Sequence, residues 1–144
     1  MSLAVRHAVC AAVALCAAGC PRLPPPVPRP SVEVERIERA GSSLRAHLRV
    51  HNRGDAALRL TAVDWELVLA GRPLARGRTR GGRSLAPGAH AAVVVELAIP
   101  APLEGELRRT AAQRRAIELR GTVHLEDAGG RGRPAPFDEE AALP

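Results

Sequence analysis

From residue 32 onward, apolar and polar residues alternate over most of the chain, and this pattern constrains the possible folds more than any other feature. In residues 44–51, arginine and histidine separate four apolar residues: Leu44, Ala46, Leu48 and Val50. Successive side chains of a β-strand point to opposite faces, so a period of two predicts strands with one buried and one solvent-facing side. Comparable runs lie at residues 58–69, 74–79, 93–99 and 117–125.

Two breaks in the alternation predict irregular strands. Ile37 is out of phase with Val32 and Val34, as in a β-bulge. A one-residue shift near Thr61 and Ala62 predicts either a bulge or a strand that changes sheets. Turn residues separate the runs at four places: residues 52–55, 70–73, 86–88 and 128–130.

One segment has the pattern of a helix. Pro102 suits a first helical turn, and Leu103, Leu107 and Ala111 recur at the spacing of one helix face. About seven strands and one short helix in a chain of this length predict an all-β fold, a sandwich like those of immunoglobulin and fibronectin type III domains. Trp65 is in phase with the apolar residues around it and is the clearest core candidate.

All three cysteines lie within the first twenty residues. Residues 1–19 resemble the signal peptide of a bacterial lipoprotein, with Arg6, an apolar run and a short Ala-Ala-Gly sequence before Cys20. The resemblance implies that the thiol of Cys20 receives lipid, although Ala17 stands where these signals prefer leucine. A cleaved secretory protein and a retained anchor are the alternatives. Residues beyond Cys20 must fold without a disulfide or a cysteine metal ligand.

Residues 20–31 form the predicted linker between the lipidated cysteine and a single domain over residues 32–144. Six of the ten residues from 21 to 30 are proline, which favours an extended polyproline II segment. At about 3.1 Å per residue, such a linker holds the domain roughly 30 Å from the lipid.

The basic charge does not by itself indicate nucleic-acid binding. The formal net charge is +6, and every basic residue apart from histidine is arginine. We expect no nucleic-acid partner, because the chain has only two aromatic residues, Trp65 and Phe137, and no known binding motif. An unknown envelope protein or an anionic envelope polymer remains a candidate partner.

Three groups of polar residues were weighed as sites. His47 and His51 share a strand face but lie about 13 Å apart, too far to bind one metal. The carboxylates of Asp64 and Glu66 lie about 7 Å apart, yet any polar strand face produces such a pair. A third group is a row of arginines that fits the solvent side of an edge strand: Arg76, Arg78 and Arg80. We therefore predict no catalytic, cofactor-binding or metal-binding residues.

The order of these features resembles the WHy domain, the water stress and hypersensitive response domain of group 2 late embryogenesis abundant (LEA) proteins. The resemblance rests on residues spread over the whole domain: Leu48, Val50, Asn52, Val63, Asp64, Trp65, Gly71, Pro73, Leu74, Gly77, Pro87, Ile117, Leu119, Gly121, Pro136 and Phe137. The family's Asn-Pro-Asn turn corresponds to Asn52, Arg53 and Gly54, where we expect Gly54 to supply a left-handed conformation.

The resemblance implies a fibronectin-like sandwich with a helix, no enzyme activity and a link to desiccation or stress. We therefore expect a lipid-anchored envelope protein with a binding or structural role and no cofactor. The outer membrane is expected because Pro21, rather than aspartate, follows Cys20. The alternative is an envelope assembly or transport factor that accepts an apolar ligand or a peptide strand at a sheet edge.

Overall fold

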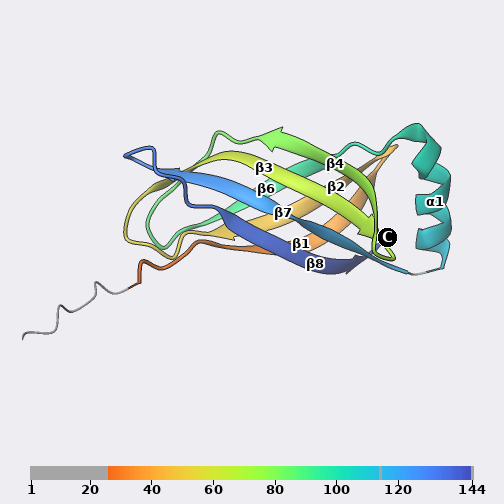
Figure 1. Ribbon diagram of the computed structural model, residues 1–144, viewed down its shortest axis with the longest axis horizontal. Helices are drawn as coiled ribbons and strands as arrows, with labels where there is room; N and C mark the ends of the chain where they lie inside the picture. Colours follow the sequence, from red (N-terminus) through yellow and green to blue (C-terminus); the bar gives the residue numbers. More distant parts are fainter. Residues whose placement is uncertain (1–25, 114, 144) are drawn as a thin grey trace, which may run out of the picture.

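The computed structural model describes residues 26–113 and 115–143, and these form a two-layer β-sandwich with one helix (Figure 1). The predicted all-β sandwich is thus confirmed. Within the described residues the elements are β1 (Ser31–Ala40), β2 (Ser43–His51), β3 (Leu58–Leu69), β4 (Arg72–Arg80), β5 (Ser84–Leu85), β6 (His90–Leu97), α1 (Ala101–Ala112), β7 (Ala116–Asp127) and β8 (Ala135–Ala142).

Two antiparallel sheets make up the layers. Sheet A contains three strands in the order β1-β2-β6. Sheet B contains five, in the order β4-β3-β7-β8, with the two-residue β5 paired to the start of β3. All strand pairs are antiparallel. The described residues contain eight strands where about seven were expected, and the additional strand is the two-residue β5.

Alternation places the apolar side of each strand between the sheets, as predicted. Leu48 and Val50 of β2, Leu67 of β3 and Leu119 of β7 all belong to one continuous core of buried residues. Trp65 belongs to this core and is 5% exposed. Val94 is 51% exposed because it occupies an outward position on β6.

Both predicted strand irregularities are present. The β1–β2 register shifts between Val34 and Arg36, which restores the inward position of Ile37. The β3–β7 register shifts between Leu60 and Ala62. Because β3 pairs with β7 on both sides of that shift, the irregularity is a bulge and not a change of sheet.

The predicted helix is also confirmed, and it covers one end of the sandwich (Figure 1). Leu107 is buried, and Leu103 and Ala111 pack against the core on the same helix face. Glu106 of α1 forms an ion pair with Arg72 at the start of β4. The N-terminal segment leaves from the opposite end, which we call the N-terminal pole.

Candidate functional site

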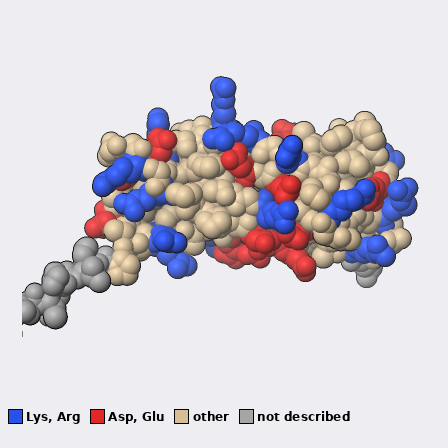
Figure 2. Space-filling view, in the orientation of Figure 1, with Lys and Arg blue, Asp and Glu red and all other residues tan. Residues whose placement is uncertain are grey.

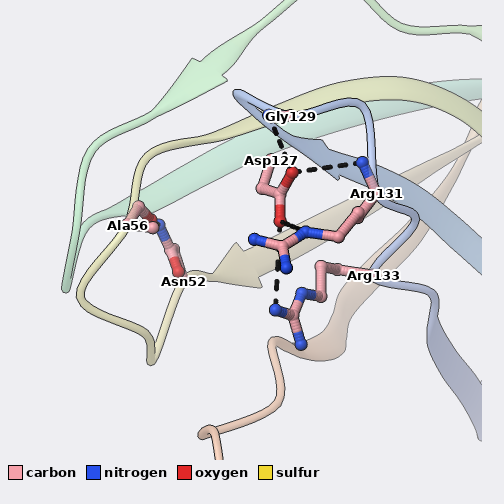
Figure 3. Close-up of polar contacts among 6 residues, drawn as sticks. All are labelled: Asn52, Ala56, Asp127, Gly129, Arg131 and Arg133. Carbon is pink, nitrogen blue, oxygen red and sulfur yellow. Dashed lines mark hydrogen bonds and ion pairs between the residues drawn. The ribbon is translucent and has the colours of Figure 1, made fainter.

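Asn52 connects two loops at the N-terminal pole. It follows β2, is 1% exposed and therefore needs partners for its polar atoms. Its main-chain N–H donates to the carbonyl oxygen of Ala89 at 2.9 Å. Its side-chain Nδ2 lies within hydrogen-bonding distance of three carbonyl oxygens, of Ala56 (2.8 Å), Leu85 (3.2 Å) and Ala86 (3.1 Å), so that its two N–H groups are shared among them. One amide thus holds the loop after β2 against the β5–β6 turn, and Figure 3 shows Asn52 with Ala56 of that loop.

The conformation of the Asn52, Arg53 and Gly54 segment differs in one respect from the expectation. Gly54 does not have a positive φ, so it does not supply the left-handed residue that was predicted. Instead, Asn52 Oδ1 accepts a hydrogen bond from the Gly54 N–H at 3.1 Å, which closes an Asx turn. The side chain of Asn52, and not the backbone freedom of glycine, therefore shapes this loop, while Arg53 is exposed.

Asp127 organises the neighbouring β7–β8 loop, and the sequence reasoning missed this residue. Its side chain is 8% exposed. Oδ1 accepts hydrogen bonds from the N–H groups of Gly129 (2.9 Å) and Arg131 (3.1 Å), while Oδ2 lies 3.0 Å from Arg131 Nε and 3.9 Å from Arg133 Nη2 (Figure 3). An aspartate two residues before a glycine pair is a recognisable Asx-turn signal.

Hydrogen bonding also changes the acidity of this carboxyl group. The backbone N–H of Arg131 lowers the pKa of Asp127 below its ordinary value, and partial burial opposes this effect. The Gly129 N–H and the Arg131 guanidinium lower the pKa further. Asp127 is therefore held as a carboxylate and serves as the fixed acceptor of its loop.

The proline-rich segment packs against these same loops. Pro30 is buried, and a cavity of about 160 Å³ is lined jointly by Val27, Pro28 and Pro30 and by the loops of Asn52 and Asp127. A second hollow, of about 420 Å³, lies between residues 28–30 and the β7–β8 loop. The last part of the linker is thus docked on the domain, whereas a free spacer was expected over its whole length.

The outer face of sheet B carries charges that are paired across strands. Asp64 of β3 lies 3.2 Å from Arg78 Nη1 on β4 and 2.7 Å from His124 Nε2 on β7. Glu66 lies 2.6 Å from Arg120 Nη2. Asp64 and Glu66 do share one face, as predicted, but each carboxylate is bound by a cation or a histidine of a neighbouring strand. That pairing suits a structural role better than acid–base chemistry.

A groove of about 760 Å³ lies on this face. Its lining contains basic and acidic groups, from Arg76, Arg78 and Arg120 and from Asp64, Glu66 and Asp138, and it also contains the apolar residues Trp65, Pro136 and Phe137. The predicted arginine row does lie on an edge strand, because β4 pairs only with β3.

The histidines of the described residues lie in three separate places, one of which is the contact of His124 with Asp64. His47 contacts Glu38 at 2.9 Å, and this hydrogen bond lowers the pKa of Glu38. His51 stacks on His90 with ring centroids 3.9 Å apart. Desolvation, followed by the neighbouring His90, lowers the pKa of His51. Across the described part of the chain, no group of three or more potential ligands is arranged to hold a metal.

The proposed lipid-attachment residue, Cys20, lies outside the described residues. Among those that are described, no helix is long and apolar enough to span a bilayer.

Comparisons with known proteins identify the fold. No family model and no curated protein matches the sequence. Solved structures do match, including a protein from Arabidopsis thaliana (TM-score 0.57, 18% identity, 82% of this chain and 84% of that one). At2g46140.1, provisionally described as a LEA protein, also matches, with a TM-score of 0.53 and 18% identity over 81% of this chain and 72% of that one. A Bordetella pertussis protein provisionally named ApaA matches as well, with a TM-score of 0.55 and 19% identity over 83% of this chain and 98% of that one. The chain therefore shares its fold with proteins that include one provisionally described as a LEA protein.

Proposed function

We propose that this chain is a lipid-anchored, non-catalytic WHy-type module of the bacterial cell envelope, with a binding or structural role in desiccation and stress. The observation that carries the proposal is the fold likeness to a provisional LEA protein over 81% of the chain. The WHy-like residues of the sequence, above all Asn52, support the same assignment, because Asn52 organises the pole of this fold. At 18% identity the likeness concerns fold, so the stress role is our inference.

The docked proline segment supports a defined orientation at the membrane. Seven residues lead from Cys20 to Val27, and they span at most roughly 25 Å when fully extended. Since Val27 and Pro28 line a cavity with the pole loops, the N-terminal pole faces the lipid and α1 faces away. Pro21 at the position after Cys20 favours the outer membrane.

Surface contact is a better mechanism than carriage of an apolar ligand. The sheet B groove has an apolar part that includes Trp65 and Phe137, but charged side chains of β3, β4, β7 and β8 line it too, so it suits a partner that carries charged groups. The arginines Arg76 and Arg80 are exposed and have no acidic partner within 4 Å among the described residues. They are available to an envelope protein or an anionic polymer.

The anchor is tested by metabolic labelling with a clickable fatty acid, comparing wild type with Cys20→Ser and with Cys16→Ser. We expect label and membrane association in wild type and Cys16→Ser, and neither in Cys20→Ser. Equal labelling of all three proteins, or none in wild type, contradicts the anchor.

The stress role is tested by survival after drying of a deletion strain. Complementation with wild type should restore survival, and Cys20→Ser should restore it less. Normal survival and a normal envelope in the deletion strain would refute the stress role while leaving the labelling result intact.

A further inference from the structure

The two edges of sheet B carry opposite charge. The strand order places β4 at one edge and β8 at the other. The basic edge consists of the exposed arginines of β4, a strand without acidic residues: Arg72, Arg76, Arg78 and Arg80. The acidic edge consists of three exposed carboxylates of β8, a strand without basic residues: Asp138, Glu139 and Glu140. Figure 2 shows acidic side chains gathered at the lower centre, where β8 runs in Figure 1.

Most of these charges are not neutralised within the molecule. Arg72 and Arg78 are paired with Glu106 and Asp64. The other five have no oppositely charged group within 4 Å in residues 26–113 and 115–143: Arg76, Arg80, Asp138, Glu139 and Glu140.

Neighbouring groups relieve the acidic edge only in part, through the electrostatic attraction between Asp138 and Arg120. Asp138 stands opposite Arg120 in the β7–β8 register, but Arg120 is already bound to Glu66 (2.6 Å) and Glu118 (3.4 Å). Glu140 stands opposite Glu118, a like charge. Like charges directly opposite in a sheet are destabilising, and a cationic partner from outside would relieve this repulsion.

We propose that the chain associates with a second copy of itself, the basic edge of one copy against the acidic edge of the next. Because every pair in sheet B is antiparallel, β4 and β8 run in opposite directions. A copy displaced sideways therefore presents its β4 antiparallel to β8. A register that pairs Arg76 with Glu140 also pairs Arg78 with Asp138 and keeps all four side chains on the outer face. Residues 74–79 then face residues 137–142, and neither stretch contains proline.

The charge pattern also selects against symmetric pairing. Two β4 edges, or two β8 edges, would bring like charges together, which is a common way of blocking edge-to-edge pairing. Only the unlike pairing is attractive, and it is head-to-tail, so it can continue from copy to copy. Exposed ion pairs are individually weak and are screened by salt, so this association should be salt-sensitive and should grow with local concentration.

The test uses residues 26–144, which contain both sheets and the whole described core, so it does not depend on lipidation or on the stress role. The double variant Arg76→Glu/Arg78→Glu reverses the charge of two residues of the basic edge. The double variant Asp138→Arg/Glu140→Arg does the same for two residues of the acidic edge. Arg29→Glu/Arg53→Glu is the control, since it makes the same charge change at the N-terminal pole. Circular dichroism confirms that each variant is folded. Sedimentation equilibrium then gives the average mass over a concentration series at low and high salt.

Wild type and the pole control should exceed the monomer mass at low salt and return to it at high salt. Each edge variant alone should remain monomeric, and an equimolar mixture of the two should associate, because their reversed edges are complementary. A wild type that is monomeric throughout overturns the proposal. So does self-association of either edge variant to the wild-type extent, or a mixture that stays monomeric.

Discussion

The indole ring of Trp65 lies over Gly77, its cross-strand neighbour on β4. A Cβ atom added to Gly77 would lie 2.6 Å from Cζ2 and 2.9 Å from Cε2 of that ring. Phe137 lies beside Gly121 on β7, where an added Cβ would meet the carbonyl oxygen of Asp64 first and then Cζ of Phe137, at 2.7 Å. The two aromatic residues of the chain therefore each cover a glycine, and the sandwich accommodates both rings at positions where a neighbouring strand has no side chain.

Gly77→Ala should destabilise the domain by about 1–3 kcal/mol, the usual range for overpacking a filled core. Gly82→Ala is the matched control, because a Cβ there meets no atom within 4 Å and its φ is not left-handed. Urea unfolding of both variants measures the difference. Equal stability of the two would show that the ring can move aside.

Trp65→Ala should cost about 3–5 kcal/mol, since the side chain is 5% exposed. Trp65→Phe should cost clearly less. It removes an Nε1–H group that is buried without a hydrogen-bond partner among the described residues, and so removes that group's desolvation penalty. Unfolding should be followed by circular dichroism, because Trp65 is the sole tryptophan. An unchanged melting temperature in Trp65→Ala would contradict burial of the ring and indicate that it is available to a partner.

Asn52→Ala should destabilise the domain by about 2–4 kcal/mol, because it removes several buried hydrogen bonds and leaves carbonyl oxygens without donors. Hydrogen exchange should rise at the same time in the loop after β2 and in the β5–β6 turn, which Asn52 joins. Arg53→Ala is the control: it is exposed, and its effect should stay within about 0.5 kcal/mol. Similar losses of unfolding free energy in both variants would contradict the role assigned to Asn52.

Asp127→Asn should lower the melting temperature at neutral pH, and the deficit relative to wild type should shrink in acid. The pKa of Asp127 is depressed below its ordinary value of 3.8. A carboxylate with a depressed pKa contributes stability above that ordinary value and loses it as pH falls through the folded-state pKa. Melting curves from pH 7 to pH 2 measure the effect. A deficit that stays constant over this range would exclude the charge of Asp127 as its source.

The sequence predicted the strands whose two faces differ in polarity. In β2 and β7, polar residues separate the inward side chains, so the period of two is visible over the whole strand. The bulge in β3 was equally visible, because the inward residues change phase between Leu60 and Val63. The strand β5 was not predictable in this way. Two residues, Ser84 and Leu85, cannot display a period, and their pairing depends on a distant partner.

The organisation of the N-terminal pole was harder to predict than the strands. A buried amide such as Asn52 looks in the sequence like any turn residue, because its partners are backbone carbonyls more than 30 positions away at Leu85 and Ala86. The conformation of Gly54 was misjudged for the same reason, since the side chain of Asn52 fixes the loop. Docking of residues 28–30 could not be foreseen from a proline-rich composition, which indicates stiffness but not contacts.

The buried Pro30 stands immediately before β1, and this position determines how the domain would respond to pulling. Tension that enters through the N-terminal segment reaches Ser31 at the N-terminal pole and runs along the axis of β1 toward the α1 end. The β1–β2 ladder contains nine paired positions along that axis. If the opposing pull acts at the α1 end, these pairs are loaded together in shear rather than opened one after another. Under such a load, the resistance of β1 to separation from β2 would be shared along the whole strand.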